Sequence, residues 1–308
     1  MLTAKPLSSG DLVADRRLEH ARGYAAAGEP AAAAELTEQA LEIVPAWAAG
    51  WFELAGFHEA AGHRDAAIAA YERALALDAA DACGAGLRLA RLGARPTPAA
   101  PPPAHVAGLF DGYAARFEEA LVGRLGYRAP AVLAAAIAAV APGRRFRHGL
   151  DLGCGTGLMA EALAGSVDRL DGVDLSAAMI AVAARKGLYA TLEVGDVTAA
   201  LAARPPAALD LVIAADVFCY LGDLAPVVAA AARAAAPGAI FAFTVERWDG
   251  GDAMELHLGD SLRYAHTRSH LERVTTAAGF APLHLEETVL RRDRDADVGG
   301  LVAVFTKT

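Results

Sequence analysis

A run of glycines near the middle of the sequence is the feature with the clearest chemistry. Residues 149–157 read Gly-Leu-Asp-Leu-Gly-Cys-Gly-Thr-Gly, between an apolar run typical of a strand and a segment typical of a helix. Because glycine lacks a Cβ, the backbone there can turn sharply and a ligand can lie against it. In doubly wound α/β folds, such a loop at the carboxyl edge of a parallel sheet binds nucleotides. The sequence therefore predicts a nucleotide-like ligand at this loop.

Two kinds of ligand compete for the loop. The string from Gly155 to Ala160 satisfies the Gly-x-Gly-x-x-Ala pattern of dinucleotide-binding enzymes, which keeps an NAD-linked oxidoreductase as an alternative. Asp151 comes just before the glycines, and its carboxylate would attract a cation and repel a pyrophosphate. This acidic residue therefore favours a cationic ligand over a dinucleotide.

The longer string at residues 151–157, Asp-Leu-Gly-Cys-Gly-Thr-Gly, resembles motif I of the class I S-adenosylmethionine-dependent methyltransferases. Later motifs of that family have counterparts in the same order at residues 171–176, 195–197, 210–216 and 236–243. The resemblance extends over roughly residues 110–306, and several motifs at matching spacing are more specific than one glycine loop. It implies a methyltransferase with S-adenosyl-L-methionine as cofactor.

The resemblance assigns roles to single residues. Asp174 would accept hydrogen bonds from the ribose hydroxyls and Asp196 from the adenine amino group, although each also suits a strand end or a turn. Met179 would pack on the adenine or fill the core, and a carbonyl near Ala215 would receive the methionine ammonium. The predicted cofactor-binding residues are Asp151, Gly153, Gly155, Gly157, Asp174, Leu175, Met179, Asp196, Val197, Ala215 and Tyr113.

The acceptor pocket is expected from three pieces of the chain: an amphipathic helix at 106–125, the loop at 216–220 and an insertion at 246–267. Methyl transfer from a sulfonium is an in-line displacement, so the protein mainly positions the acceptor and excludes water. A general base is needed only for a hydroxyl or a protonated amine. Tyr264 and His266 are the candidates for acceptor contact or proton removal, with a position on the surface or packing inside a lid as the alternative.

Strands and helices alternate after residue 140, which predicts a parallel sheet covered on both faces. The resemblance to class I methyltransferases makes this an α/β fold, a seven-stranded doubly wound sheet with an antiparallel last strand. The last two strands are joined by a polar stretch without a helix, so we expect them to form an antiparallel hairpin. The expected strands are 147–152, 169–174, 190–194, 209–214, 239–245, 283–290 and 300–306. The expected helices are 130–140, 157–164, 176–186, 222–235 and 269–278.

An internal repeat precedes this domain. Gly28 and its neighbouring alanines recur 34 residues later at Gly62, a period and pattern that resemble a pair of tetratricopeptide repeats (TPR). Residues 82–93 could add one capping helix. Five prolines then favour a stiff linker. The predicted organisation is an all-α TPR-like domain at 1–94, a Pro-rich linker at 95–104 and a methyltransferase domain at 105–308.

This order resembles a family of predicted methyltransferases in which TPRs precede the catalytic domain. In that family a Phe-Asp-x-Tyr-Ala-x-x-Phe helix introduces the domain, and here the string stands at residues 110–117. The resemblance does not supply an acceptor. The main hypothesis is an active methyltransferase whose TPR segment recruits or orients a protein partner or the substrate. The alternative is a TPR binding scaffold with a cofactor-binding but catalytically relic methyltransferase domain.

Composition bounds the partners. The 308 residues carry a net charge of −9 and no long basic block, which argues against nucleic acid as a partner. Three cysteines without a Cys-x-x-Cys pair, and histidines without ligand spacing, predict neither disulfides nor a metal site. No signal peptide or membrane-spanning run is visible, so a cytoplasmic protein is expected. The expected acceptor is a small molecule or a protein.

Overall fold

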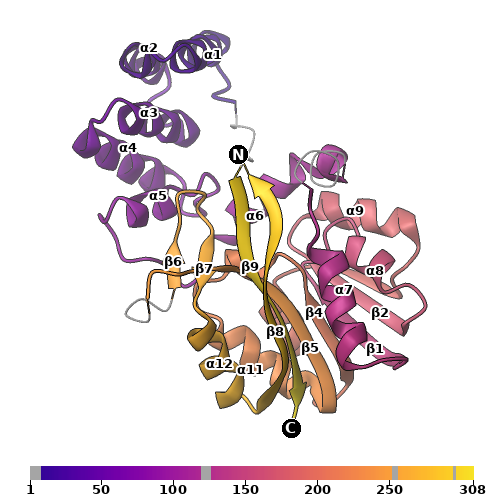
Figure 1. The fold of residues 1–308 in the computed structure, drawn as a ribbon. Coiled ribbons are helices and arrows are strands. Elements are labelled where there is room, and N and C mark those ends of the chain that lie inside the picture. The colour runs from indigo at the N-terminus through magenta and orange to yellow at the C-terminus, as the bar shows by residue number, and fades with distance from the viewer. Residues whose placement is uncertain (1–7, 119–125, 252–255, 294–295) are drawn as a thin grey trace. The chain divides into compact units, whose positions relative to one another are not determined.

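The computed structural model describes residues 8–118, 126–251, 256–293 and 296–308. The chain divides into two compact units, Met1–Leu109 and Phe110–Thr308. The first unit is helical, and the second is a sheet with helices packed on it (Figure 1). Among the described helices, none combines the length and the apolar character needed to cross a bilayer.

The first unit contains two helix–turn–helix pairs and a shorter fifth helix. Each helix packs on the next along the chain. Gly28 and Gly62, 34 residues apart, close the two turns in the left-handed conformation, with φ of 85° and 80°. The helical nature of this region and the helix expected within 82–93 are confirmed, whereas its assignment as TPR stays a prediction. The helices are α1 (Leu12–Ala26), α2 (Pro30–Ile43), α3 (Ala48–Ala60), α4 (Arg64–Leu77) and α5 (Ala85–Arg91).

Small residues let these helices approach closely. Ala33, Ala40, Ala67 and Ala74 are all buried, at equivalent positions of the two pairs. At Gly50 in α3, an added Cβ would lie 2.6 Å from the ring of Trp47. Such contacts leave no room for larger side chains, which explains why a repeat so rich in alanine still forms a packed interior.

The sheet of the second unit is mixed. Strands β3, β2, β1, β4 and β5 lie side by side in that order and run parallel. Beyond β5, β9 runs antiparallel and carries β8 on its other edge, as the expected hairpin. The strands are β1 (Phe146–Leu152), β2 (Val167–Asp174), β3 (Thr191–Val194), β4 (Leu209–Ala214), β5 (Ala235–Arg247), β6 (Leu256–Leu258), β7 (Tyr264–His266), β8 (Phe280–Asp293) and β9 (Ala296–Lys307).

Alternate residues of the central strands bury opposite faces of this sheet. In β4, Leu211 and Ile213 pack with helices α7 (Ala129–Val140) and α8 (Leu158–Ala162). Val212 and Ala214 instead face a second cluster that includes three helices. Those helices are α10 (Val197–Ala203), α11 (Ala225–Ala234) and α12 (Arg268–Ala277). Helix α9 (Ala177–Lys186) packs against β2 and β3.

The number of strands differs from the expectation. The described sheet has nine strands rather than seven, because the expected insertion at 246–267 itself supplies β6 and β7. Strand β7 pairs with the last two residues of β5, where Glu246 is also opposite Gly300 of β9. Since a strand has two edges, β7 must lie on the edge that β4 occupies nearer the start of β5. The short β6–β7 hairpin therefore extends the sheet beyond the end of β4.

The single helix expected at 106–125 is also corrected. Helix α6 (Pro103–Asp111) ends at Asp111, and a short 3₁₀ turn, η1 (Ala114–Arg116), follows. Gly112 weakens the helix there, and the Asp111 carboxylate is used elsewhere, as an acceptor for the start of α9. The remainder of the expected helix, residues 119–125, lies outside the described residues.

Candidate functional site

The glycine loop joins the end of β1 to the start of α8. Gly153, Gly155 and Gly157 all have positive φ, at 63°, 53° and 92°. An added Cβ on Gly153 would lie 2.5 Å from Cγ2 of Val217, and one on Gly157 would lie 3.2 Å from the ring of Tyr189. At Gly155 no heavy atom beyond those of the adjacent residues lies within 4 Å of that position. The loop is therefore tightly packed at Gly153 and Gly157 and open at Gly155, so a ligand can lie against its middle.

Asp174 at the end of β2 is tied to this loop. One oxygen of its buried carboxylate accepts a hydrogen bond from the N–H of Gly155 at 2.9 Å, and the other from the N–H of Ser176 at 2.8 Å. A carboxylate has about four acceptor positions. Two of them thus remain for the hydroxyls of a ribose, and the residues present fit an adenosyl ligand. Burial raises the pKa of Asp174.

Asp151 lies deeper in β1 and is 1% exposed. The hydroxyl of Tyr189 donates to its Oδ2 at 2.6 Å. Burial raises the pKa of Asp151 to about 7. A cation bound nearby would favour the ionised carboxylate and lower this pKa again. The side chain is therefore poised to respond to a positively charged ligand.

The pKa of Asp151 predicts a pH-dependent stability effect. The unfolded chain loses this proton near pH 4, whereas the folded chain keeps it until about pH 7. Stability from this group is therefore full below pH 4 and lost as the pH rises toward 7. We expect Asp151→Asn to remove that loss, so its melting temperature relative to the wild type should be higher at pH 8 than at pH 4.5.

Thermal melts of both proteins at pH 4.5, 6 and 8 measure this difference. Asp223→Asn serves as control, because Asp223 is exposed and its carboxylate accepts a hydrogen bond from the N–H of Ala225, which the amide oxygen of asparagine can also accept. A difference between Asp151→Asn and the wild type that stays constant across this pH range would contradict the assignment.

The other residues predicted to contact adenine follow β2 and β3, at the same edge of the sheet. Leu175 is half-buried, and Met179 of α9 is almost completely buried. Asp196 is exposed and caps α10, accepting a hydrogen bond from the N–H of Ala199 at 2.9 Å. Val197, the first residue of that helix, is buried. Asp196 is thus a helix cap in this structure, and its contact with adenine stays a prediction.

A tyrosine that the sequence did not single out stands at the carbonyl of Ala215. The hydroxyl of Tyr127 donates to this carbonyl at 3.4 Å. Burial, and after it the negative charges of Asp216 and Asp151, raise the pKa of Tyr127. This carbonyl follows β4, which pairs with β1, the strand that leads into the glycine loop, and a carbonyl oxygen there can accept a hydrogen bond from an ammonium group. The surroundings of Ala215 therefore fit the methionine end of the predicted cofactor.

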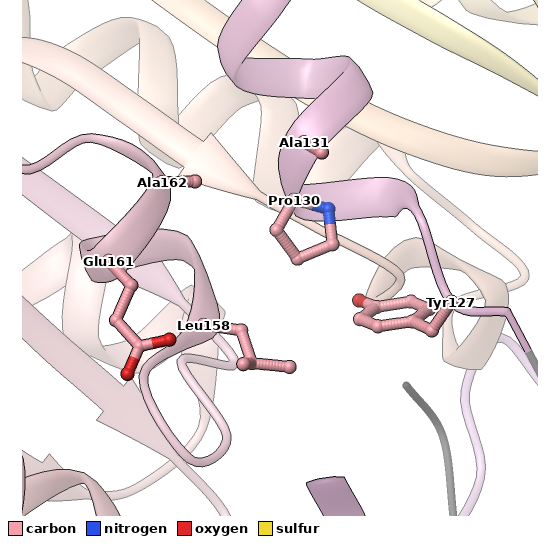
Figure 2. A pocket seen from close by; sticks show the side chains of 6 residues that line it. All are labelled: Tyr127, Pro130, Ala131, Leu158, Glu161 and Ala162. Carbon is pink, nitrogen blue, oxygen red and sulfur yellow. The ribbon is translucent and has the colours of Figure 1, made fainter. Parts of the chain in front are cut away.

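Tyr127 also lines a pocket of about 350 Å³ between α7 and α8. Figure 2 shows Pro130 and Ala131 on one side of it and Leu158 on the other. Most of the lining is hydrocarbon. Because Leu158 directly follows Gly157, the pocket adjoins the glycine loop. The residues that line it are Tyr127, Pro130, Ala131, Leu158, Glu161 and Ala162.

Aromatic side chains gather beside the loop after β4. The ring of Phe110 contacts those of Phe117, at 6.2 Å between centroids, and Tyr220, at 5.6 Å. Tyr113 is half-buried and lies edge-on to Phe117 at 5.8 Å. Asp111 anchors this segment by accepting a hydrogen bond from the hydroxyl of Ser176 at 2.5 Å. Arg263 of the insertion lies over the ring of Tyr220, 5.3 Å from its centroid, so all three pieces expected to form the acceptor pocket meet here.

Tyr264 and His266 lie in β7, and both are completely buried. The Nε2 of His266 lies 3.1 Å from the carbonyl oxygen of Gly222, and its ring stacks on His270. Burial lowers the pKa of His266 to about 4 and raises that of Tyr264 to about 12. In this structure neither side chain is accessible to an acceptor. Their packing matches the alternative role inside a lid, and a catalytic role stays a prediction.

One group of side chains has the spacing of a metal site. The ligand atoms of Asp216, Cys219 and Glu246 all lie within 4.8 Å of one another. Both carboxylates, however, accept hydrogen bonds from the guanidinium of Arg291. A cationic side chain thus already fills the position between them, and these residues do not suggest a metal ion.

Comparisons with known proteins find methyltransferases. Residues 150–243 match the family model described as a methyltransferase domain. A ubiquinone biosynthesis O-methyltransferase of Burkholderia multivorans is 33% identical over 105 residues, which cover 33% of this chain and 45% of that protein. The protein of the same name from Hahella chejuensis is 34% identical over 113 residues, 35% of this chain and 46% of that protein. The chain thus spans less than half the length of these curated relatives.

A solved structure of an S-adenosylmethionine-dependent methyltransferase from Methanosarcina mazei is also similar. It superposes with a TM-score of 0.46 at 16% identity, over 56% of this chain and 96% of that one. The segment that matches the family model, residues 150–243, runs from the second half of β1 through most of β5, so it contains the glycine loop, Asp174 and Ala215. Residues 150–243 therefore form a methyltransferase domain.

Proposed function

We propose that the protein transfers a methyl group from S-adenosylmethionine to an acceptor, with the N-terminal helical unit as a TPR-like module that binds a partner or orients the substrate. The observation that carries the proposal is the pair of hydrogen bonds that Asp174 accepts, from the N–H groups of Gly155 and Ser176, which join the open glycine loop to the start of α9. This arrangement leaves carboxylate acceptors free beside a backbone cradle.

The residues of the chain would act mainly by binding and orientation. The cofactor, when bound, supplies a methyl group already activated by a sulfonium. Asp174 would accept hydrogen bonds from the ribose hydroxyls and Asp196 from the adenine amino group. The carbonyl of Ala215 and the carboxylate of Asp151 would hold the ammonium end. The aromatic side chains around Phe110 would limit the access of water to the methyl group, which raises the fraction of productive encounters.

An oxygen acceptor is the first to test. The curated relatives are named O-methyltransferases, although this chain spans under half of their length. A hydroxyl acceptor would need a base to take its proton. We therefore propose phenolic hydroxyl compounds as the initial acceptor panel, with amines as the comparison.

Calorimetric titration of the full chain with S-adenosylhomocysteine tests the cofactor site, and titration with NADH tests the dinucleotide alternative. We expect binding of the first and none of the second. A labelled-methyl assay on host lysate, fractionated by size, then separates small-molecule from protein acceptors. Cofactor binding without transfer to any fraction, together with a partner lost on deletion of residues 1–94, would instead support a scaffold.

A further inference from the structure

Asp216 has an unusual backbone conformation. Its φ is 60°, in the left-handed region that residues other than glycine adopt uncommonly. Its N–H donates to Oγ1 of Thr244 at 2.8 Å. The carbonyl of Ala215 belongs to the same peptide plane, and in a trans peptide it points opposite to this N–H. The conformation of Asp216 therefore sets the direction of the carbonyl proposed to receive the ammonium group.

Arg291 of β8 holds the side chain of Asp216. It is 4% exposed, and its guanidinium donates to Oδ1 of Asp216 at 2.6 Å and to Oε1 of Glu246. Glu246 also pairs with Arg263 at 3.4 Å. The register of β8 against β9 shifts between Val289 and Arg291, and such an irregularity redirects side chains. Two carboxylates and two guanidinium groups thus form a cluster with no net charge.

We propose that Arg291 is a positioning residue of the cofactor site. By holding the carboxylate of Asp216, it keeps this residue left-handed and so keeps the carbonyl of Ala215 aimed at the ammonium group. The inference rests on the proposed function for its ligand. Its structural part does not depend on any ligand: Arg291, 75 positions later in the chain, maintains the conformation of residue 216.

The net charge of the cluster determines which variants test this role. Arg291→Met leaves Asp216 without its guanidinium partner and the cluster with one excess negative charge. The further change Asp216→Gly removes that charge, leaves the pair of Glu246 and Arg263 neutral, and supplies a residue that adopts positive φ freely. Arg263→Met is the matched control, because it also removes one positive charge but leaves the hydrogen bond between Arg291 and Asp216 in place.

Binding of S-adenosylhomocysteine is measured by calorimetry below each variant's melting temperature. We expect Arg291→Met to bind roughly 10-fold more weakly, because the carbonyl of Ala215 would lose its hydrogen bond to the charged ammonium group of the ligand. The affinity of the double variant Asp216→Gly/Arg291→Met should return to within about 3-fold of the wild type, because glycine keeps the positive φ at residue 216. A roughly 3-fold difference in affinity corresponds to less than about 1 kcal/mol. Arg263→Met should melt at a lower temperature yet keep wild-type affinity.

Hydrogen exchange of the Asp216 amide supplies a readout without ligand. It should be faster in Arg291→Met than in Arg263→Met. If Arg291→Met binds like the wild type, or Arg263→Met weakens binding equally, or glycine at 216 gives no rescue, the positioning role is overturned. If the wild type itself binds no S-adenosylhomocysteine, the proposed function fails, and unchanged exchange of the Asp216 amide in Arg291→Met would then overturn the positioning role independently.

Discussion

Asp174→Ala is expected to bind S-adenosylhomocysteine about 100-fold more weakly than the wild type. The substitution removes the hydrogen bonds from the amides of Gly155 and Ser176, and it removes the acceptor proposed for the ribose hydroxyls. The two hydrogen bonds proposed from the ribose hydroxyls to this carboxylate, at ~1.5 kcal/mol each, account for a loss of affinity of this size. Calorimetric titration at a temperature where the variant is folded measures the effect.

Asp171→Ala is the matched control. Asp171 lies in the same strand and is also buried, but its partners are His148 and Arg169, away from the glycine loop. Its loss should lower the melting temperature and leave the affinity nearly unchanged. Equal affinity of Asp174→Ala and the wild type would remove the main support for the cofactor site.

Gly153→Ala should have the second large effect. A residue with a Cβ at φ of 63° is strained by about 1–2 kcal/mol. The new methyl group would also lie 2.5 Å from Val217, which must move away, and crowding of this kind adds about 1–3 kcal/mol. Because both residues flank the predicted ligand, we expect a lower melting temperature together with a loss of cofactor affinity of roughly 10-fold or more.

The control for this variant is Gly165→Ala, in the turn between α8 and β2. Gly165 also has positive φ, at 81°, but its Cβ position is open. This variant should therefore show only the backbone strain, as a modest fall in melting temperature, with normal affinity. A loss of affinity in Gly165→Ala as large as that in Gly153→Ala would show that strain anywhere in the domain, rather than the shape of the loop, explains the result.

The parallel part of the sheet could be predicted because its signals are local. Apolar runs, glycine turns and helix caps each lie within about ten residues, and their order along the chain sets the topology. The strands β6 and β7 have three residues each, too short for any periodic pattern. The end of α6 depends on Asp111, whose partners Ser176 and Ala178 lie more than sixty residues later. A contact of that range leaves no trace in a local pattern.

The same distinction holds for the candidate site. Asp174 and the glycine loop could be placed together because parallel neighbouring strands end at one edge of a sheet. Tyr127 and Arg291 could not, because each is a single residue whose contact is made across the fold, to Ala215 and to Asp216. The burial of Tyr264 and His266 also depends on the pairing of β7 with β5, which only the folded chain reveals.

The hairpin of β8 and β9 has a consequence for the order in which the protein matures. The guanidinium that grips Asp216 belongs to this hairpin, which joins the sheet through β9. A nascent chain synthesised as far as β5 already contains the glycine loop, Asp174 and Thr244, yet the carboxylate of Asp216 still lacks its guanidinium partner. The proposed role of Arg291 therefore predicts that the cofactor site reaches its final geometry only after β9 has been synthesised, so that a shorter nascent chain would bind the methyl donor more weakly.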